Sequence, residues 1–99
     1  MQPESEAIES GGRKAAQDWF LTAEHCLRVV ARQKESFTSD DVWETLREFD
    51  VKTYDNRAMG AVFQNAYRDH LIVPVNKWQE SRRRVAHRRP VRVWKSLLM

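Results

Sequence analysis

Five arginines fall within an eight-residue run that ends at residue 89. They are Arg82, Arg83, Arg84, Arg88 and Arg89. A segment typical of a β-strand lies on each side of this run, residues 71–75 before it and residues 90–94 after it. The guanidinium group keeps its charge at any working pH and binds phosphate oxygens in pairs. A hairpin with such a tip is therefore expected to meet an anion, and the polyanion that fits it best is a nucleic acid.

The two halves of the chain carry opposite net charge. Residues 1–50 hold six Lys or Arg and eleven Asp or Glu, a difference of −5, whereas residues 51–99 hold eleven and three, a difference of +8. Such a chain presents one basic face to a polyanion and is repelled from it on the other. The alternative is an ordinary solvated surface, but random scatter seldom leaves five arginines together.

Three helices are expected before the arginine run, over residues 13–33, 38–50 and 55–70. The first has an apolar stripe at steps of three and four residues: Ala16, Trp19, Phe20, Ala23, Cys26, Leu27 and Val30. Thr38 is expected to cap the second helix in a box-like pairing with Asp41. In that helix Val42, Trp43, Leu46 and Phe49 are expected to face inward. Residues 1–12 are expected to form a disordered acidic tail, which leaves one domain over residues 13–99.

The third helix, with Asp55 as its expected N-cap, carries the candidate base-reading residues. Its buried side is predicted to be Met59, Val62, Phe63, Ala66 and Tyr67. The outer side holds Asn56, Arg57, Gln64 and Arg68. Arginine can form two hydrogen bonds with guanine, and asparagine or glutamine two with adenine. Gly60 either keeps this face low enough for close approach or allows tight packing on the preceding helix.

The element order is helix, a short extended piece at Phe37, helix, helix, strand, long loop or partly paired ribbon, strand. Pro74 in the first long strand favours a sheet edge. The predicted fold class is α+β, with three helices packed on a small antiparallel hairpin. This order resembles the winged helix-turn-helix domains, over roughly residues 13–97. Residues 57–63, 71–74 and 89–94 also look like small winged-helix proteins of actinobacterial phages.

The resemblance implies a DNA-binding accessory factor in transcription, recombination or replication, working in the bacterial cytoplasm. In such domains the second helix of the motif enters the major groove, which here is the helix over 55–70. The predicted DNA-binding residues are Asn56, Arg57, Gln64, Arg68, Lys77, Arg82, Arg83, Arg84, Arg88, Arg89 and Arg92. If about five phosphates are neutralised, log affinity should fall with log salt at a slope of about −4 to −5. The segment between the two predicted strands, the wing of such domains, is longer and richer in arginine here than in a typical winged helix-turn-helix protein.

Two alternatives use other features of the sequence. Leu21 and Val29 lie off the apolar stripe of helix 13–33, so this helix offers a surface for a homodimer or for a host protein that the chain would modulate. Trp78 can stack on an unpaired base of a single strand, although an aromatic residue at such a position more often packs on the sheet. Trp94 is expected to cover the other face of the sheet.

Enzymatic chemistry is not indicated. Asp40 and Asp41 are explained by helix capping, and His25, His70 and His87 have no metal-ligand spacing with one another or with Cys26. We expect no catalytic residues, no metal, no cofactor and no small-molecule substrate. The longest apolar run is far below the roughly 20 residues of a membrane span. A single cysteine excludes an internal disulfide and suits a reducing cytoplasm.

Overall fold

The computed structural model describes residues 3–49, 57–83 and 89–99, with side chains from residue 17 onward. They form helix α1 (Pro3–Gln33), strand β1 (Ser36–Phe37), helix α2 (Ser39–Leu46), helix α3 (Ala58–Arg68), and strands β2 (Ile72–Glu80) and β3 (Pro90–Ser96). Over these ranges the chain is α+β, with three helices and one antiparallel three-stranded sheet. The element order is the one that the sequence predicted.

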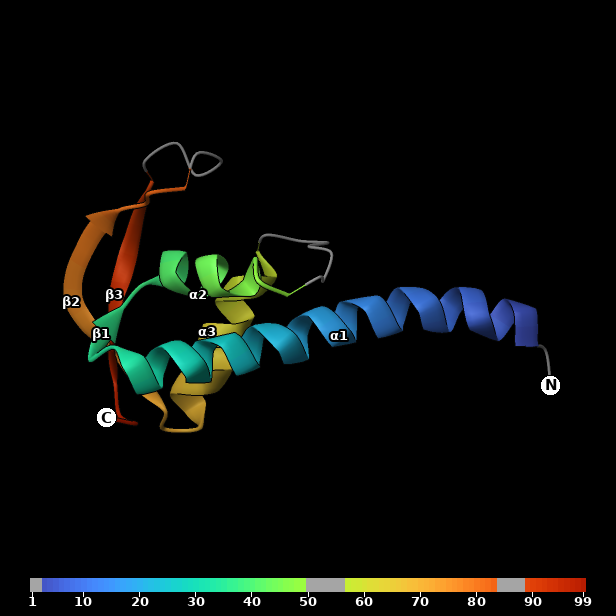
Figure 1. Cartoon of the computed structure of the whole chain (residues 1–99), viewed down its shortest axis with the longest axis horizontal. Coiled ribbons are helices and arrows are strands. Elements are labelled where there is room, and N and C mark those ends of the chain that lie inside the picture. The colour runs from blue at the N-terminus through green and yellow to red at the C-terminus, as the bar shows by residue number, and fades with distance from the viewer. Residues whose placement is uncertain (1–2, 50–56, 84–88) are drawn as a thin grey trace.

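The sheet has the strand order β1-β3-β2, so β3 is its central strand (Figure 1). Trp94 of β3 lies opposite Phe37 on one side and opposite Pro74 on the other. The prediction that Pro74 lies in an edge strand is confirmed, since β2 pairs only with β3 among the described strands. An edge strand tolerates proline because one row of its backbone groups has no partner to bond. β2 continues to Glu80, five residues beyond the predicted end of this strand.

Helix α1 begins at Pro3, ten residues before the start that the apolar pattern predicted at Arg13. Residues 3–12, the expected disordered tail, are the first part of this helix in the structure. Proline suits a first helical turn because its missing N–H is not needed there. In Figure 1 this part of α1 extends away from the body that the other elements form. The division of the chain at residue 12 stays a prediction.

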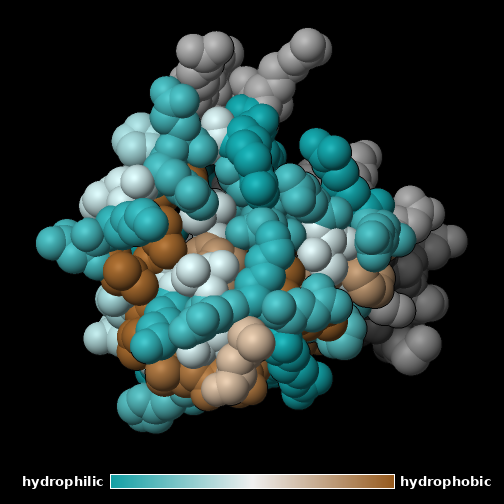
Figure 2. All heavy atoms as spheres, turned by 60° about the vertical axis from the view of Figure 1, so that its left-hand side comes forward, coloured by the Kyte–Doolittle hydropathy of each residue, from teal (hydrophilic) through white to brown (hydrophobic). Residues whose placement is uncertain are grey.

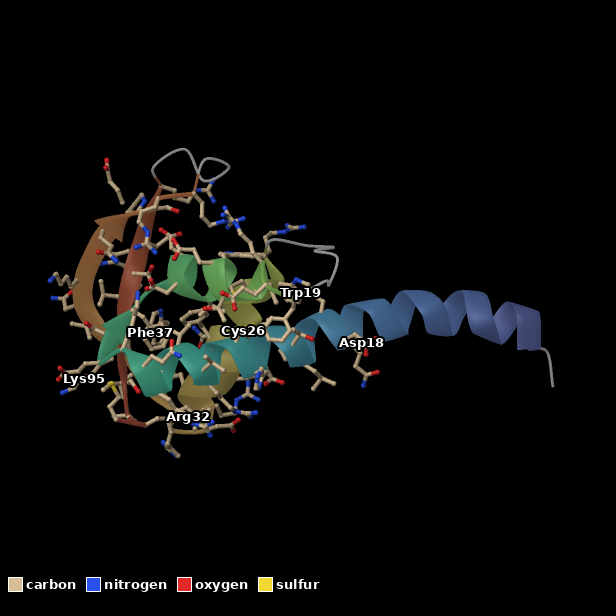
Figure 3. The ribbon with its side chains drawn as sticks, in the orientation of Figure 1. Asp18, Trp19, Cys26, Arg32, Phe37 and Lys95 are labelled. Carbon is tan, nitrogen blue, oxygen red and sulfur yellow. The ribbon has the colours of Figure 1, made fainter. Side chains whose placement is uncertain are left out.

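The hydrophobic core lies between the three helices and the sheet. From the stripe predicted in the first helix, the buried residues are Trp19, Ala23, Cys26, Leu27 and Val30. The rings of Trp19 and Trp43 lie 5.8 Å apart, and those of Phe63 and Trp94 lie 5.6 Å apart. Figure 3 shows Trp19 on the side of α1 that faces α2, whereas Asp18 and Arg32 point outward. Trp94 therefore belongs to the core under α3.

Two residues predicted to be buried are not. Phe49 is 40% exposed, because α2 ends at Leu46 and residues 47–49 form turns beyond the helix. Its ring meets the ring of His25 edge-on at 6.0 Å. Tyr67 is 46% exposed, with its ring 6.1 Å from that of Trp94 at the border of the core. Phe49 thus lies beyond the end of α2 and Tyr67 lies in the last turn of α3, where the core no longer covers them.

The start of α2 is as predicted. Thr38 has the extended backbone of an N-cap, and its hydroxyl accepts from the first-turn amides. In return its own amide donates to the carboxylate of Asp41 at 2.9 Å. This reciprocal pairing, the capping box, satisfies backbone donors that a helix start leaves without partners.

Helix α3 differs from its predicted bounds at both ends. Its N-cap is Arg57, which has helical backbone angles and no side-chain capping bond, while Asp55 lies outside the described residues. The helix ends at Arg68, before the predicted end at His70. There the amide of Leu71 donates to the carbonyl of Ala66 and the amide of His70 to that of Tyr67. His70 has a φ of 62°, so the helix closes in a Schellman motif without the usual glycine.

No helix in the described part of the chain is both long and apolar enough to cross a lipid bilayer.

Candidate nucleic-acid interface

The loop end of the β2–β3 hairpin, just after Glu80, is attached to the start of α2 by Asp40. This carboxylate is only 2% exposed. It accepts a hydrogen bond of 2.7 Å from the hydroxyl of Ser81 and one of 2.6 Å from the backbone amide of Arg82. Within the hairpin, the amide of Ser81 also donates to the carbonyl of Arg89 at 2.9 Å. The position of the hairpin relative to α2 is therefore set by buried hydrogen bonds.

The guanidinium group of Arg82 lies among carboxylates. Its Nη2 atom is 3.0 Å from Asp41 and 3.1 Å from Glu44, and its Nε atom is 3.8 Å from Asp40. The hydrogen bond to Asp41 raises the pKa of Arg82 above its already high value. The prediction assigned this side chain to phosphate, whereas in the structure its charge is balanced by protein carboxylates.

Asp41 collects three donors on its carboxylate. Lys34 Nζ lies 2.8 Å away, and the Thr38 amide and Arg82 guanidinium complete the set. Burial alone would raise the pKa of Asp41, but hydrogen bonds from Lys34, Thr38 and Arg82 and the charge of Lys34 outweigh it and lower the pKa. The group therefore stays ionised at neutral pH, as the partner of two cations requires.

Arg83 packs against the aromatic core. Its guanidinium carbon lies 4.1 Å from the ring centroid of Trp43, in a cation–π contact. Burial lowers the pKa of Arg83 from its ordinary value. Together Arg82 and Arg83 hold the first leg of the hairpin, residues 81–83, against α2.

A cleft of about 570 Å³ opens where α2, α3 and the hairpin meet. Its lining residues are Ser39, Asp40, Trp43, Arg57, Met59, Gly60, Phe63, Gln64, Ser81, Arg83, Arg89, Val91, Arg92 and Trp94. The set contains four guanidinium groups and one carboxylate, and that carboxylate is buried against Ser81 and Arg82. The inner surface of the cleft is therefore cationic, over a floor of apolar side chains.

The predicted site residues fall into four groups. Those in the lining of the cleft are Arg57, Gln64, Arg83, Arg89 and Arg92. Lys77 and Arg68 are exposed but lie outside the lining. Arg82 is ion-paired with α2. Asn56, Arg84 and Arg88 lie outside the described residues. The tertiary structure thus brings α3 and both legs of the hairpin to one concave surface, and it separates Arg82 from them.

Gly60 lies in this lining and is exposed. A Cβ atom placed on it would meet nothing within 4 Å. Packing against the preceding helix therefore does not account for this glycine, and that interpretation is wrong. The other interpretation of Gly60 still stands, namely that the absence of a side chain between Arg57 and Gln64 lets a ligand approach this face closely.

Sequence reasoning missed the residues that fix the hairpin. Asp40 was explained only by the capping of α2, and no role was given to Ser81. The sequence does show two adjacent carboxylates at a helix start, Asp40 and Asp41, and an arginine run about 40 residues later. Their opposite charges suggest an ion pair but do not show which arginine forms it.

The face turned forward in Figure 2, on the sheet side, is largely hydrophilic with smaller hydrophobic areas between the polar side chains.

Within the described residues, no group of three His, Cys, Asp or Glu side chains is placed to hold a metal ion. Cys26 is fully buried, and burial, with a smaller effect of the charge of Glu48, raises the pKa of its thiol to about 11. The thiol therefore stays protonated at neutral pH and acts as a small apolar core residue.

Comparisons with protein-family models, with curated proteins and with solved structures found no match to this chain.

Proposed function

We propose that the chain is a winged-helix protein that binds double-stranded DNA. In this proposal α3 enters the major groove and the β2–β3 hairpin, the wing, grips the adjacent backbone. The observation that carries it is the cationic cleft, which joins Arg57 and Gln64 of α3 to Arg83, Arg89 and Arg92 of the hairpin on one surface. A duplex needs such a shared surface, because its bases and its phosphates are contacted at the same time.

The chemistry of the cleft suits two kinds of contact. Guanidinium groups at Arg89 and Arg92 can bind phosphate oxygens, which gives affinity without sequence information. Arg57 and Gln64 lie on the exposed face of α3, seven residues and so about two turns apart. From there they can reach base edges, where arginine selects guanine and glutamine selects adenine. Arg68 extends the same face at the end of the helix.

Binding to a labelled duplex across a salt series tests the proposal. Removing Arg89 and Arg92 together by alanine substitution should reduce the slope of log affinity against log salt by about 2, since each phosphate contact contributes about one unit. The matched control replaces Arg28 and Arg32, two exposed arginines of α1, and removes the same charge. Figure 3 shows Arg32 on the side of α1 away from the hairpin. If both double variants reduce the salt slope equally, the protein attracts DNA only through its overall charge, which contradicts the proposal.

Sequence selectivity requires a separate experiment. Selection of bound fragments from genomic DNA should recover a motif for the wild-type chain, and Gln64→Ala should relax one position of that motif at a cost of about 1–3 kcal/mol for the preferred base. A uniform loss across all fragments would assign Gln64 to phosphate or structural contacts.

A second candidate function is favoured by exposed apolar side chains away from the cleft. Leu21 is 58% exposed on α1, and Phe49 is 40% exposed after α2. These residues would suit a protein partner or a second copy of the chain, on a winged-helix frame. Failure of the protein to be retained on heparin and on mixed duplex DNA at moderate salt would favour this candidate.

A further inference from the structure

Trp78 differs from the other three tryptophans in its exposure. It is 53% exposed, whereas Trp19, Trp43 and Trp94 are at most 9% exposed and belong to the core. Its ring is not loose, because the guanidinium carbon of Arg92 lies 4.6 Å from the ring centroid. The structure therefore holds an indole in place on one side and leaves about half of its surface open.

An irregularity of β2 brings these two side chains together. Pro74 lies opposite Trp94, and Trp78 lies opposite Arg92. Four residues of β2 thus span the distance that two residues of β3 cover, so β2 holds two extra residues in a bulge. Without them, Asn76 would lie opposite Arg92. A bulge is a built feature of a strand that re-aims its side chains.

The face on which Trp78 lies follows from the pairing. Arg92 and Trp94 are two residues apart on β3 and share one face of the sheet. Residues directly opposite in an antiparallel pair also share a face, so Trp78 lies on the face of Arg92. Arg92 and Trp94 both line the cleft. Trp78 therefore borders the cationic cleft, with Arg92 as the residue common to both.

We propose that Trp78 and Arg92 form a stacking site for an unpaired nucleobase, so that the preferred ligand is a duplex with an adjoining single strand. This inference rests on the proposed function, because the duplex part would occupy the cleft. The base would stack on the open indole surface, which every base can do because each has a π face. Arg92 would hold the indole from the other side and attract the phosphate next to that base.

The charges around the site favour nucleic acid over an apolar protein segment. Arg92 lies opposite Trp78 in β3, and Arg89, which comes just before β3, lines the same cleft as Arg92. Glu80 is the one carboxylate in the described part of β2. A cationic border around a single exposed aromatic ring matches the anionic backbone and flat bases of a single strand.

Intrinsic fluorescence tests the inference, since acrylamide quenches the exposed Trp78 far more than the three buried tryptophans. The blunt duplex is the reference for any effect on Trp43 and Trp94, which line the cleft. The wild-type chain is titrated with a blunt duplex, with the same duplex carrying a short oligo-dT overhang, and with free oligo-dT. The overhang should quench the emission, protect it from acrylamide, and raise the affinity over the blunt duplex by roughly fivefold to a hundredfold, as one stacked base typically does. Trp78→Ala should abolish this preference while the blunt duplex still binds, and Trp78→Phe should keep part of it.

Three results would overturn the inference. The first is that the overhang adds neither quenching nor affinity in the wild-type chain. The second is that the preference survives in Trp78→Ala, and the third is that Trp78→Ala weakens the blunt and overhang duplexes equally. The last result would assign Trp78 to the support of the hairpin, and the thermal unfolding midpoint of Trp78→Ala shows whether that variant is still folded. Failure of the proposed function gives a different pattern, namely no salt-dependent binding of the blunt duplex at all.

Discussion

The two legs of the β2–β3 hairpin use the same residue type for different purposes. In the first leg, residues 81–83, Arg82 is bound to carboxylates of α2 and Arg83 lies on Trp43. In the second leg, Arg89 and Arg92 line the cleft, and Arg92 also supports Trp78. The first leg fastens the hairpin to the body of the protein, although Arg83 also lines the cleft, and the second leg, residues 89–92, presents its charge to the cleft. The charge of an arginine alone does not tell which of these it does.

The reason is the environment on either side of the hairpin. Asp40 and Asp41 are buried at the start of α2, where the helix end favours negative charge. Buried carboxylates need partners, because desolvating an unpaired charge is costly. The arginine nearest to them in space becomes that partner. The second leg faces α3, whose exposed residues in the cleft are Arg57, Gly60 and Gln64, so its charges stay available for a ligand.

Replacing Asp40 should have the largest effect on folding. Asp40→Ala removes the acceptor for the Ser81 hydroxyl and the Arg82 amide, and we expect the free energy of unfolding to fall by about 2–4 kcal/mol. Urea denaturation followed by circular dichroism measures this change. Asp18→Ala, at an exposed carboxylate of α1, is the control and should change stability by less than about 0.5 kcal/mol. Similar values for the two variants would mean that the first leg is not fastened by Asp40.

Single substitutions in the two legs should separate stability from binding. Arg82→Ala should lower the free energy of unfolding by about 1 kcal/mol and leave the salt slope of DNA binding unchanged, because its charge is already balanced. Arg89→Ala should leave stability within about 0.5 kcal/mol and reduce the salt slope by about 1. If Arg82→Ala reduces the slope as much as Arg89→Ala does, the distinction between the legs is wrong.

Acid should weaken the first leg through Asp41. The pKa of Asp41 in the folded chain lies below its value of 3.8 in an unfolded reference. The stabilisation is therefore fully present above the unfolded value and is lost as the pH falls below about 4 toward the folded value. Stability measured from neutral pH downward should fall more steeply for the wild type than for Asp41→Asn in this range. Parallel curves would show that Asp41 does not contribute in this way.

Glu44 should have the smallest effect of the three carboxylates around Arg82. It is 55% exposed, and its distance of 3.1 Å to Arg82 describes an ion pair in contact with water. Glu44→Gln is expected to change the free energy of unfolding by no more than about 0.5 kcal/mol, and the change should vanish at high salt. A larger effect that persists at high salt would mean that the exposed Glu44, and not the buried Asp40 and Asp41, holds the hairpin against α2.

Much of the element order follows from local patterns. The capping box of Thr38 and Asp41 and the edge position of Pro74 were predicted and are confirmed. The apolar stripe of α1 is confirmed from Trp19 to Val30 with Phe20 half-buried, while the side chain of Ala16 lies outside the described residues. Helix ends were predicted less well. Nothing in the sequence marks Arg68 as the end of α3, because His70 takes the left-handed conformation that glycine usually supplies.

The candidate site was predicted in part. The sequence alone indicated α3 and the arginine run as the two surfaces, and the cleft contains members of both. It did not indicate that Arg82 would be bound by α2, nor that Trp78 would meet Arg92. The binding of Arg82 by α2 requires two segments about 40 residues apart in the chain to meet, as the contact between Arg82 and Asp41 shows. The contact between Trp78 and Arg92 depends on a bulge, which shifts the register of a strand without leaving a clear signal in its residues.

Periodicity, capping residues and charge composition are local properties, so the amino-acid sequence by itself determined the helices, the hairpin and the basic character of the second half. The division of labour among the arginines was decided only by the tertiary structure. Each guanidinium group is equally charged in the extended chain, and its role depends on whether folding brings it to a buried carboxylate, an aromatic ring or an open surface.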